Sequence, residues 1–274
     1  MSLTRILCAL TFALLLGAGG AQAQSNQASL ELVEPLAEYK LYVAEHTASL
    51  VEDTKEFVGA IKDGDVEKAK SLFAPTRRNY EKIEPIAELF ADLDVSMDSR
   101  ADDYEKGEAD PNFGGFHRIE YVLWEKNTTE GLDKYADKLL ADVIELDSRV
   151  SELTFPPEIV VGGAAVLMEE VAATKISGEE DRYSRTDLWD FEANFDGSRK
   201  IFELFKPLID DEAFIAKVES NFADVYEVLA DYQTEDGGFV SYEKLTDMDR
   251  RVLSAKVNTL AEELSTLRGR LGLG

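Results

Sequence analysis

The chain has 274 residues with 55 acidic and 29 basic side chains, so its formal net charge at pH 7 is −26. A protein this acidic should repel nucleic acid and anionic lipid surfaces, whose binding depends on Lys and Arg neutralising phosphates, and should attract cations. The single cysteine, Cys8, lies in the N-terminal apolar run. A mature chain without that run has no disulfide, thiolate nucleophile or iron–sulfur site.

Residues 1–23 are typical of a secretory signal peptide. Arg5 supplies the positive start, residues 6–16 the apolar segment, and Ala21-Gln-Ala23 a small-residue cleavage site. The apolar segment is too short for a membrane span, which needs about 20 residues. We therefore expect a periplasmic protein that is not inserted in the membrane after cleavage. Its remaining 28 basic and 55 acidic residues give a net charge of −27.

Apolar residues recur with helical spacing along the rest of the chain. In the first half, the predicted helical segments are 29–62, 65–92 (kinked at Pro75 and Pro85), 98–105, a helix around His117, and 129–153. In the second half, they are 158–176, 184–209, 211–233 and 241–269. Thr246 and Asp249 could form a capping box or could equally lie inside the last of these helices. Phe155-Pro-Pro157 interrupts this pattern. We expect an all-α fold of two helical bundles, residues 24–155 and 156–274.

The segment from Gly114 to Glu120 contains His117, one of only two histidines in the chain. On a helix, residues three apart share a face, roughly 5–6 Å apart at Cβ. His117 and Glu120 could therefore bind one cation together. The alternative is a histidine that is merely hydrogen-bonded to a neighbouring carboxylate.

A second cluster lies at residues 80–85, where Glu81 and Glu84 share a helix face. This spacing suits two carboxylates that bind the same cation. The alternative is that they form ion pairs with nearby basic residues, which are Arg77, Arg78 and Lys82.

Two further clusters combine carboxylates with aromatic or basic residues, at 92–103 and 178–191. The first is dense in oxygen ligands, although its aspartates could instead cap short helices. The second is acidic and aromatic together, and its Trp189 and Phe191 could equally belong to the core.

Several catalytic sites are incompatible with the sequence. A zincin protease needs His-Glu-x-x-His on one helix, and a ferritin-like di-iron site needs Glu-x-x-His from two helices. His46 completes neither pattern, and the chain has no Gly-x-Ser-x-Gly turn or Gly-rich phosphate loop. A carboxylate-rich site with one imidazole remains, which suits Fe(III), Fe(II), Mn(II), Zn(II) or Cu(II).

The segments 110–121 and 175–191, supported by 80–85 and Asp98-x-Arg100, resemble the imelysin-like (M75) family and its branch of periplasmic iron-uptake proteins. The resemblance implies an all-helical fold of two bundles packed side by side, with a metal-binding cleft between them. It also implies that the metal ligands are His117, Glu120, Glu81, Glu84, Asp98 and Glu180.

The same resemblance implies that the protein captures iron, as Fe³⁺ or Fe²⁺, and delivers it to an inner-membrane iron permease alongside a periplasmic haem peroxidase. Zn²⁺ or Cu²⁺ could also bind in vitro. Because helical patterning begins soon after the signal peptide, the chain resembles the short form of this branch, without a cupredoxin domain. At Arg185 it departs from the family pattern, which has a histidine there. Arg cannot ligate a cation, but it can orient carboxylates by bidentate pairing.

Two alternative functions remain open, a metallopeptidase, as the family label suggests, and a binder of acidic polysaccharide. The missing His-Glu-x-x-His pattern argues against the first, so we expect no enzymatic activity. The net charge of −27 argues against the second. For an iron site of this composition, binding should release protons and weaken in acid, with a further loss as the imidazole is protonated.

Overall fold

Helices dominate the computed structural model, which describes residues 30–273. This range contains no β-strand, only an isolated antiparallel bridge between Gln233 and Phe239. The predicted all-α fold is therefore confirmed. The expected signal peptide, residues 1–23, lies outside the described residues. No described helix combines the length and the apolar character that a membrane crossing requires.

The first half of the chain is built from three longer helices and several short ones. In chain order, these are α2 (Val33–Lys62), α3 (Val66–Glu81), the 3-10 helix η1 (Glu84–Phe90), α4 (Ala91–Asp98), the 3-10 helices η2 (Ala101–Asp103) and η3 (Gly107–Ala109), α5 (Gly115–Tyr121), the π-helical turn η4 (Val122–Lys126) and α6 (Asp133–Glu152). Asp65 caps α3, and its side chain accepts a hydrogen bond from the backbone N–H of Lys68.

One predicted helix of the first half, 65–92, is divided into three elements in the structure. The helix α3 continues through Pro75 and ends at Glu81. Pro85 stands in the first turn of η1, where its missing N–H costs no hydrogen bond. Asp98 consequently ends α4, whereas the sequence pattern placed it at the start of a separate segment.

The second half contains four long helices and their short connections. In chain order, these are α7 (Pro157–Ala173), η5 (Lys175–Ser177), α8 (Asp187–Phe205), η6 (Lys206–Leu208), α9 (Glu212–Ala230), η7 (Tyr242–Lys244), α10 (Asp247–Ser265) and α11 (Leu267–Arg270). The capping box of Thr246 and Asp249 is present, so the last long helix begins there and not at residue 241.

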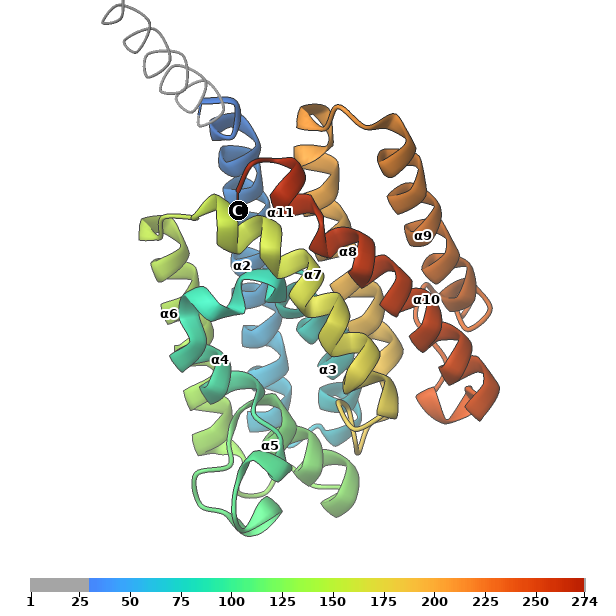
Figure 1. The fold of residues 1–274 in the computed structure, drawn as a ribbon. Coiled ribbons are helices and arrows are strands. Elements are labelled where there is room, and N and C mark those ends of the chain that lie inside the picture. The colour runs from blue at the N-terminus through green and yellow to red at the C-terminus, as the bar shows by residue number, and fades with distance from the viewer. Residues whose placement is uncertain (1–29, 274) are drawn as a thin grey trace, which may run out of the picture.

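The helices of each half pack mainly on one another (Figure 1). In the first half, α2 lies between α3 and α6, while in the second α7 packs against α8 and α10. Contacts between α3 and α8 join the halves, and buried apolar side chains from both form one continuous core. The boundary at residues 155/156 therefore stays a prediction.

Two glycines allow helices of the second half to approach the end of α3 and the start of η1 closely. A Cβ at Gly163 of α7 would lie 1.8 Å from the Pro85 carbonyl oxygen, and one at Gly197 of α8 would lie 2.3 Å from the Lys82 carbonyl oxygen. Only hydrogen fits at such distances. These backbone contacts hold α7 and α8 against the part of the chain that carries Glu81 and Glu84.

We expect Gly163→Ala to destabilise the protein by about 3 kcal/mol or more, because the added methyl group forces α7 away from rigid backbone. Gly59→Ala is the matched control. It places the same methyl group inside α2, where nothing lies within 4 Å, and should stabilise by up to about 1 kcal/mol. Urea unfolding of both variants tests the packing, and equal stabilities would contradict it.

Candidate metal centre

A close contact between two helices brings His117 and Asp98 together. Gly115, the first residue of α5, has a φ of +64°, and a Cβ there would lie 2.1 Å from the Met97 carbonyl oxygen. A side chain is therefore excluded on grounds of both conformation and space. The start of α5 consequently lies against the end of α4. Asp98 follows Met97 directly, and His117 stands two residues after Gly115.

His117 and Glu120 lie on α5, three residues apart, and both are buried. His117 Nδ1 is 3.1 Å from Glu120 Oε2. The other oxygen, Glu120 Oε1, accepts hydrogen bonds from the backbone N–H groups of Tyr183 (2.9 Å) and Ser184 (2.7 Å) and from the Ser184 hydroxyl (2.8 Å). Three hydrogen-bond donors therefore fix the Glu120 carboxylate, which in turn contacts the imidazole at Nδ1.

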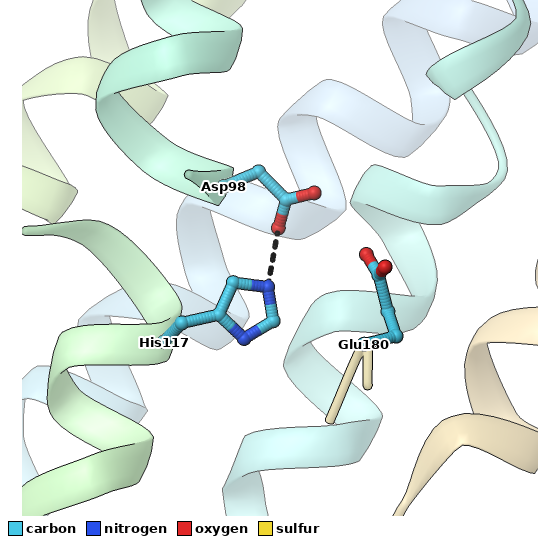
Figure 2. Close-up of side chains that lie close together, drawn as sticks. All are labelled: Asp98, His117 and Glu180. Carbon is cyan, nitrogen blue, oxygen red and sulfur yellow. Dashed lines mark ion pairs between the residues drawn. The ribbon is translucent and has the colours of Figure 1, made fainter. Parts of the chain in front are cut away.

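Two carboxylates face the other side of the imidazole (Figure 2). His117 Nε2 lies 3.5 Å from Asp98 Oδ1 at the end of α4. Glu180 approaches from the turn between η5 and α8, and its carboxylate points toward the same space. One ligand atom from each of the three residues lies within 4.8 Å of the other two. His117 Nε2 itself is buried and has no hydrogen-bond partner among the described residues.

A cleft of about 810 Å³ between η1, α4 and α7 leads to this group. Asp98 and Glu180 line it, and His117 lies behind them, 2% exposed. Eight carboxylate residues line the cleft against two arginines, Arg100 and Arg268. The acidic members are Glu84, Glu88, Asp94, Asp98, Asp103, Glu158, Glu170 and Glu180. The negative potential of such a lining concentrates cations in the cleft.

Arg77 of α3 is fully buried in the middle of the acidic cluster. Its guanidinium forms a short ion pair with Asp98 and lies 2.5 Å from Glu81 Oε1. Three more carboxylates, those of Glu180, Asp181 and Asp190, lie within 3.7 Å of it. Burial alone would lower the pKa of Arg77, but these carboxylates outweigh it and raise that pKa well above its usual value.

Glu81 and Glu84 face the same buried interior as His117, but both are paired with Lys175. The lysine ammonium donates to Glu84 at 2.7 and 2.8 Å and to Glu81 at 3.2 Å. Asn194 of α8 donates to both carboxylates as well. The structure therefore brings all six candidate ligands into one cluster, and it also shows the ion pairing that the sequence left open as an alternative, with Arg77 as one partner.

Three buried acidic residues of the cluster 178–191, which the sequence indicated as a whole, were not among the predicted metal ligands. Asp181, Asp187 and Asp190 are completely buried, and one carboxylate oxygen of each has no hydrogen-bond partner among the described residues. Burial, with repulsion from neighbouring carboxylates, raises the pKa of Asp181 to about 6 and that of Asp187 to about 8. Asp187, Asp190 and Asn194 are spaced so that all three lie on one face of α8. A polar face of this kind on a predicted helix is the sequence pattern from which these residues could have been identified.

The imidazole is strongly basic in this setting. Burial and the nearby charge of Arg77 lower the pKa of His117, but the close carboxylates of Asp98 and Glu120 outweigh them and raise it to about 10. His117 therefore carries its proton at neutral pH in the metal-free protein. A cation that binds to Nε2 must displace that proton.

Arg185 does not have the role that we expected for it. It donates to the Gly178 carbonyl oxygen at 2.9 Å and lies 3.9 Å from the exposed Glu243. It therefore reaches a surface carboxylate and not those around His117. Its φ of +62° is unusual for a residue with a side chain, and its backbone carbonyl accepts from the Tyr242 amide.

We expect Arg77→Met to lower the free energy of unfolding by about 3–5 kcal/mol at pH 7, because it leaves buried carboxylates without their counter-charge. The deficit should shrink at pH 5, where protonation replaces the lost positive charge. Arg78→Met is the control, since the Arg78 side chain is 30% exposed and, among the described residues, Glu192 is the one carboxylate with which it forms an ion pair; its effect should stay below about 1 kcal/mol. An Arg77→Met protein as stable as the parent at pH 7 would refute this account.

Comparison with known proteins agrees with the all-helical fold and with the family that the sequence resembles. Residues 35–267 match the family model described as imelysin, the M75 peptidase family. The match begins within α2 and extends to the first residue of α11, so it contains every residue of the candidate metal centre.

Similar curated proteins are components of iron-uptake systems. The iron uptake system component EfeM of Pseudomonas syringae pv. syringae B728a is 59% identical over 248 residues, which are 90% of this chain and 87% of EfeM. The iron uptake system component EfeO of Escherichia coli K12 is 56% identical over 259 residues, which are 94% of this chain and 69% of EfeO. With a family match over most of its length and relatives this similar, the chain belongs to the imelysin family.

Proposed function

We propose that the protein takes part in iron uptake by binding one iron ion between Asp98, His117 and Glu180. The observation that carries this proposal is His117 Nε2, a buried nitrogen without a hydrogen-bond partner among the described residues, at the inner end of an acidic cleft. One imidazole with two carboxylates is a ligand set that suits iron. The cleft gives a cation a route from solvent to Asp98 and Glu180.

Glu120 acts in this proposal by orienting His117, and not as a ligand. Metal-bound histidines usually donate their second N–H to a carboxylate or carbonyl, which fixes the ring and its tautomer. Glu120 Oε2 stands at Nδ1, and its other oxygen already accepts three hydrogen bonds. This leaves Nε2 as the nitrogen that faces the metal.

The charge balance of the interior favours a bound cation. Eight carboxyl groups surround the centre, from Glu81, Glu84, Asp98, Glu120, Glu180, Asp181, Asp187 and Asp190. Only Arg77 and Lys175 offer buried, permanently charged counter-groups among the described residues. In the metal-free protein, part of this excess is relieved by protons, since burial raises the pKa values of Glu84 and Asp190 well above their usual range. A cation of charge two or three can replace those protons.

The biological role that we propose follows from the similar proteins, which are named iron uptake system components. The protein would capture Fe³⁺ or Fe²⁺ in the periplasm and pass it to an inner-membrane iron permease, alongside a periplasmic haem peroxidase. Iron is then cargo and not a resident cofactor. We propose no peptidase activity, because the chain has no His-Glu-x-x-His helix.

Replacing His117 by Ala should weaken iron binding at least tenfold, because it removes the only nitrogen ligand of the proposed site. Calorimetric titration of metal-free protein with Fe²⁺ under anaerobic conditions measures this. His46→Ala is the matched control, since His46 bonds to Asn79 instead, and it should bind like the parent protein. Equal iron affinity in the His117→Ala protein would exclude the site.

Iron binding should release close to one proton from His117 near neutrality, because its pKa of about 10 in the metal-free protein keeps it protonated there. The affinity should thus rise with pH, about tenfold per unit from pH 6 to 8, over a wider range than an ordinary imidazole would give. Titrations in buffers of different ionisation enthalpy count the released protons. A pH-independent affinity would show that the imidazole does not hold the metal.

A further inference from the structure

Lys175 is the one buried lysine among residues 30–273, with an exposed fraction of 1%. It begins η5, just after the end of α7, and its ammonium group reaches into the acidic cluster beside Arg77. A buried ammonium group is costly unless it is fully paired. The groups that surround the Lys175 ammonium therefore indicate which kind of ion this position accepts.

The ammonium group of Lys175 lies within a cage of three carboxylates. It is 2.7 and 2.8 Å from the two oxygens of Glu84, 3.2 Å from Glu81 Oε2 and 3.4 Å from Glu180 Oε1. Asn194 donates to Glu81 Oε2 at 3.0 Å and to Glu84 Oε2 at 2.7 Å, which holds these two carboxylates in place. Three converging carboxylates around one positive centre is also the arrangement that a hard metal cation takes.

We propose that Lys175 is a tethered cation that fills a second cation position, formed by Glu81, Glu84 and Glu180, and so limits the protein to one metal ion. The inference rests on the proposed function, since it takes Asp98, His117 and Glu180 as the metal site. It explains why Glu81 and Glu84, which have the ligand spacing of a metal site, are instead paired with an amine.

Glu180 links the two positions. Its Oε1 faces Lys175, whereas its Oε2 accepts from Arg100 at 2.9 Å. A metal ion bound by Glu180 therefore lies near the positive charge of Lys175, and like charges repel strongly where water is excluded. Lys175 should accordingly weaken metal binding at the neighbouring site and ease release of the ion.

The test is a calorimetric titration of the metal-free protein with Mn²⁺ alone, which favours oxygen ligands. The parent protein should bind one ion per chain and Lys175→Met two, because the vacated carboxylates accept the second. Lys175→Arg, which keeps the charge, and Lys82→Met, which removes a lysine that pairs with Asp196 outside the cage, should each bind one.

A Lys175→Met protein that binds a single ion overturns the inference but leaves the proposed function intact. If the parent binds none and Lys175→Met binds one, Lys175 does block a cation position, and the proposed function fails only if the parent does not bind Fe²⁺ either. If neither binds any Mn²⁺, the inference fails.

Loss of the lysine also leaves buried carboxylates unpaired, so Lys175→Met can be unstable without metal. Lys175→Gln is the second variant, since its amide donates two hydrogen bonds without a charge, and the same two ions are expected. If both variants are unfolded in metal-free buffer, Mn²⁺ should restore their helical circular dichroism. Failure of Mn²⁺ to refold them contradicts the inference.

Discussion

The structure depends most on the burial of Arg77 among carboxylates. A charged guanidinium in a dry interior is tolerated only when it is paired on several sides, and Arg77 is paired with residues from α3, α4, α8 and the turn before α8. Because α3 and α8 belong to different halves of the chain, the same ion-pair network that prepares the candidate metal centre also joins those halves. The ion pairs around Arg77 therefore contribute both to the packing of the two halves and to the geometry of the candidate metal centre.

Much of the fold could be predicted from the sequence, because amphipathic spacing identifies long helices well. The elements over 33–62, 133–152, 157–173 and 212–230 lie where the pattern placed them. The segment around η1 was harder to predict. There Pro85 and the close backbone contacts of Gly163 and Gly197 decide the local structure, and such contacts depend on partners that are distant in sequence.

Only those parts of the candidate site that consist of residues close together in the sequence could be predicted. The spacing of His117 and Glu120 predicts their common helix face, and the same argument applies to Glu81 and Glu84. The resemblance implied that these residues, together with Asp98 and Glu180, form one site. The pairing of Glu84 with Lys175 joins residues 91 positions apart, so no local pattern reveals it. No local pattern reveals the contacts of the two imidazole nitrogens of His117 either. Nδ1 faces Glu120, whereas Nε2 faces Asp98. Sequence spacing gives the neighbours of an imidazole but not which nitrogen each one faces.

The central claim is that iron binds to His117 Nε2 together with Asp98 and Glu180. Anomalous diffraction at the iron absorption edge, from crystals of the protein loaded with iron, tests it most directly. Our account predicts a single peak within about 2.0–2.3 Å of Nε2 and of one oxygen of each carboxylate. A peak on the Nδ1 side of the ring, or one between Glu81 and Glu84 with Lys175 displaced, would contradict it.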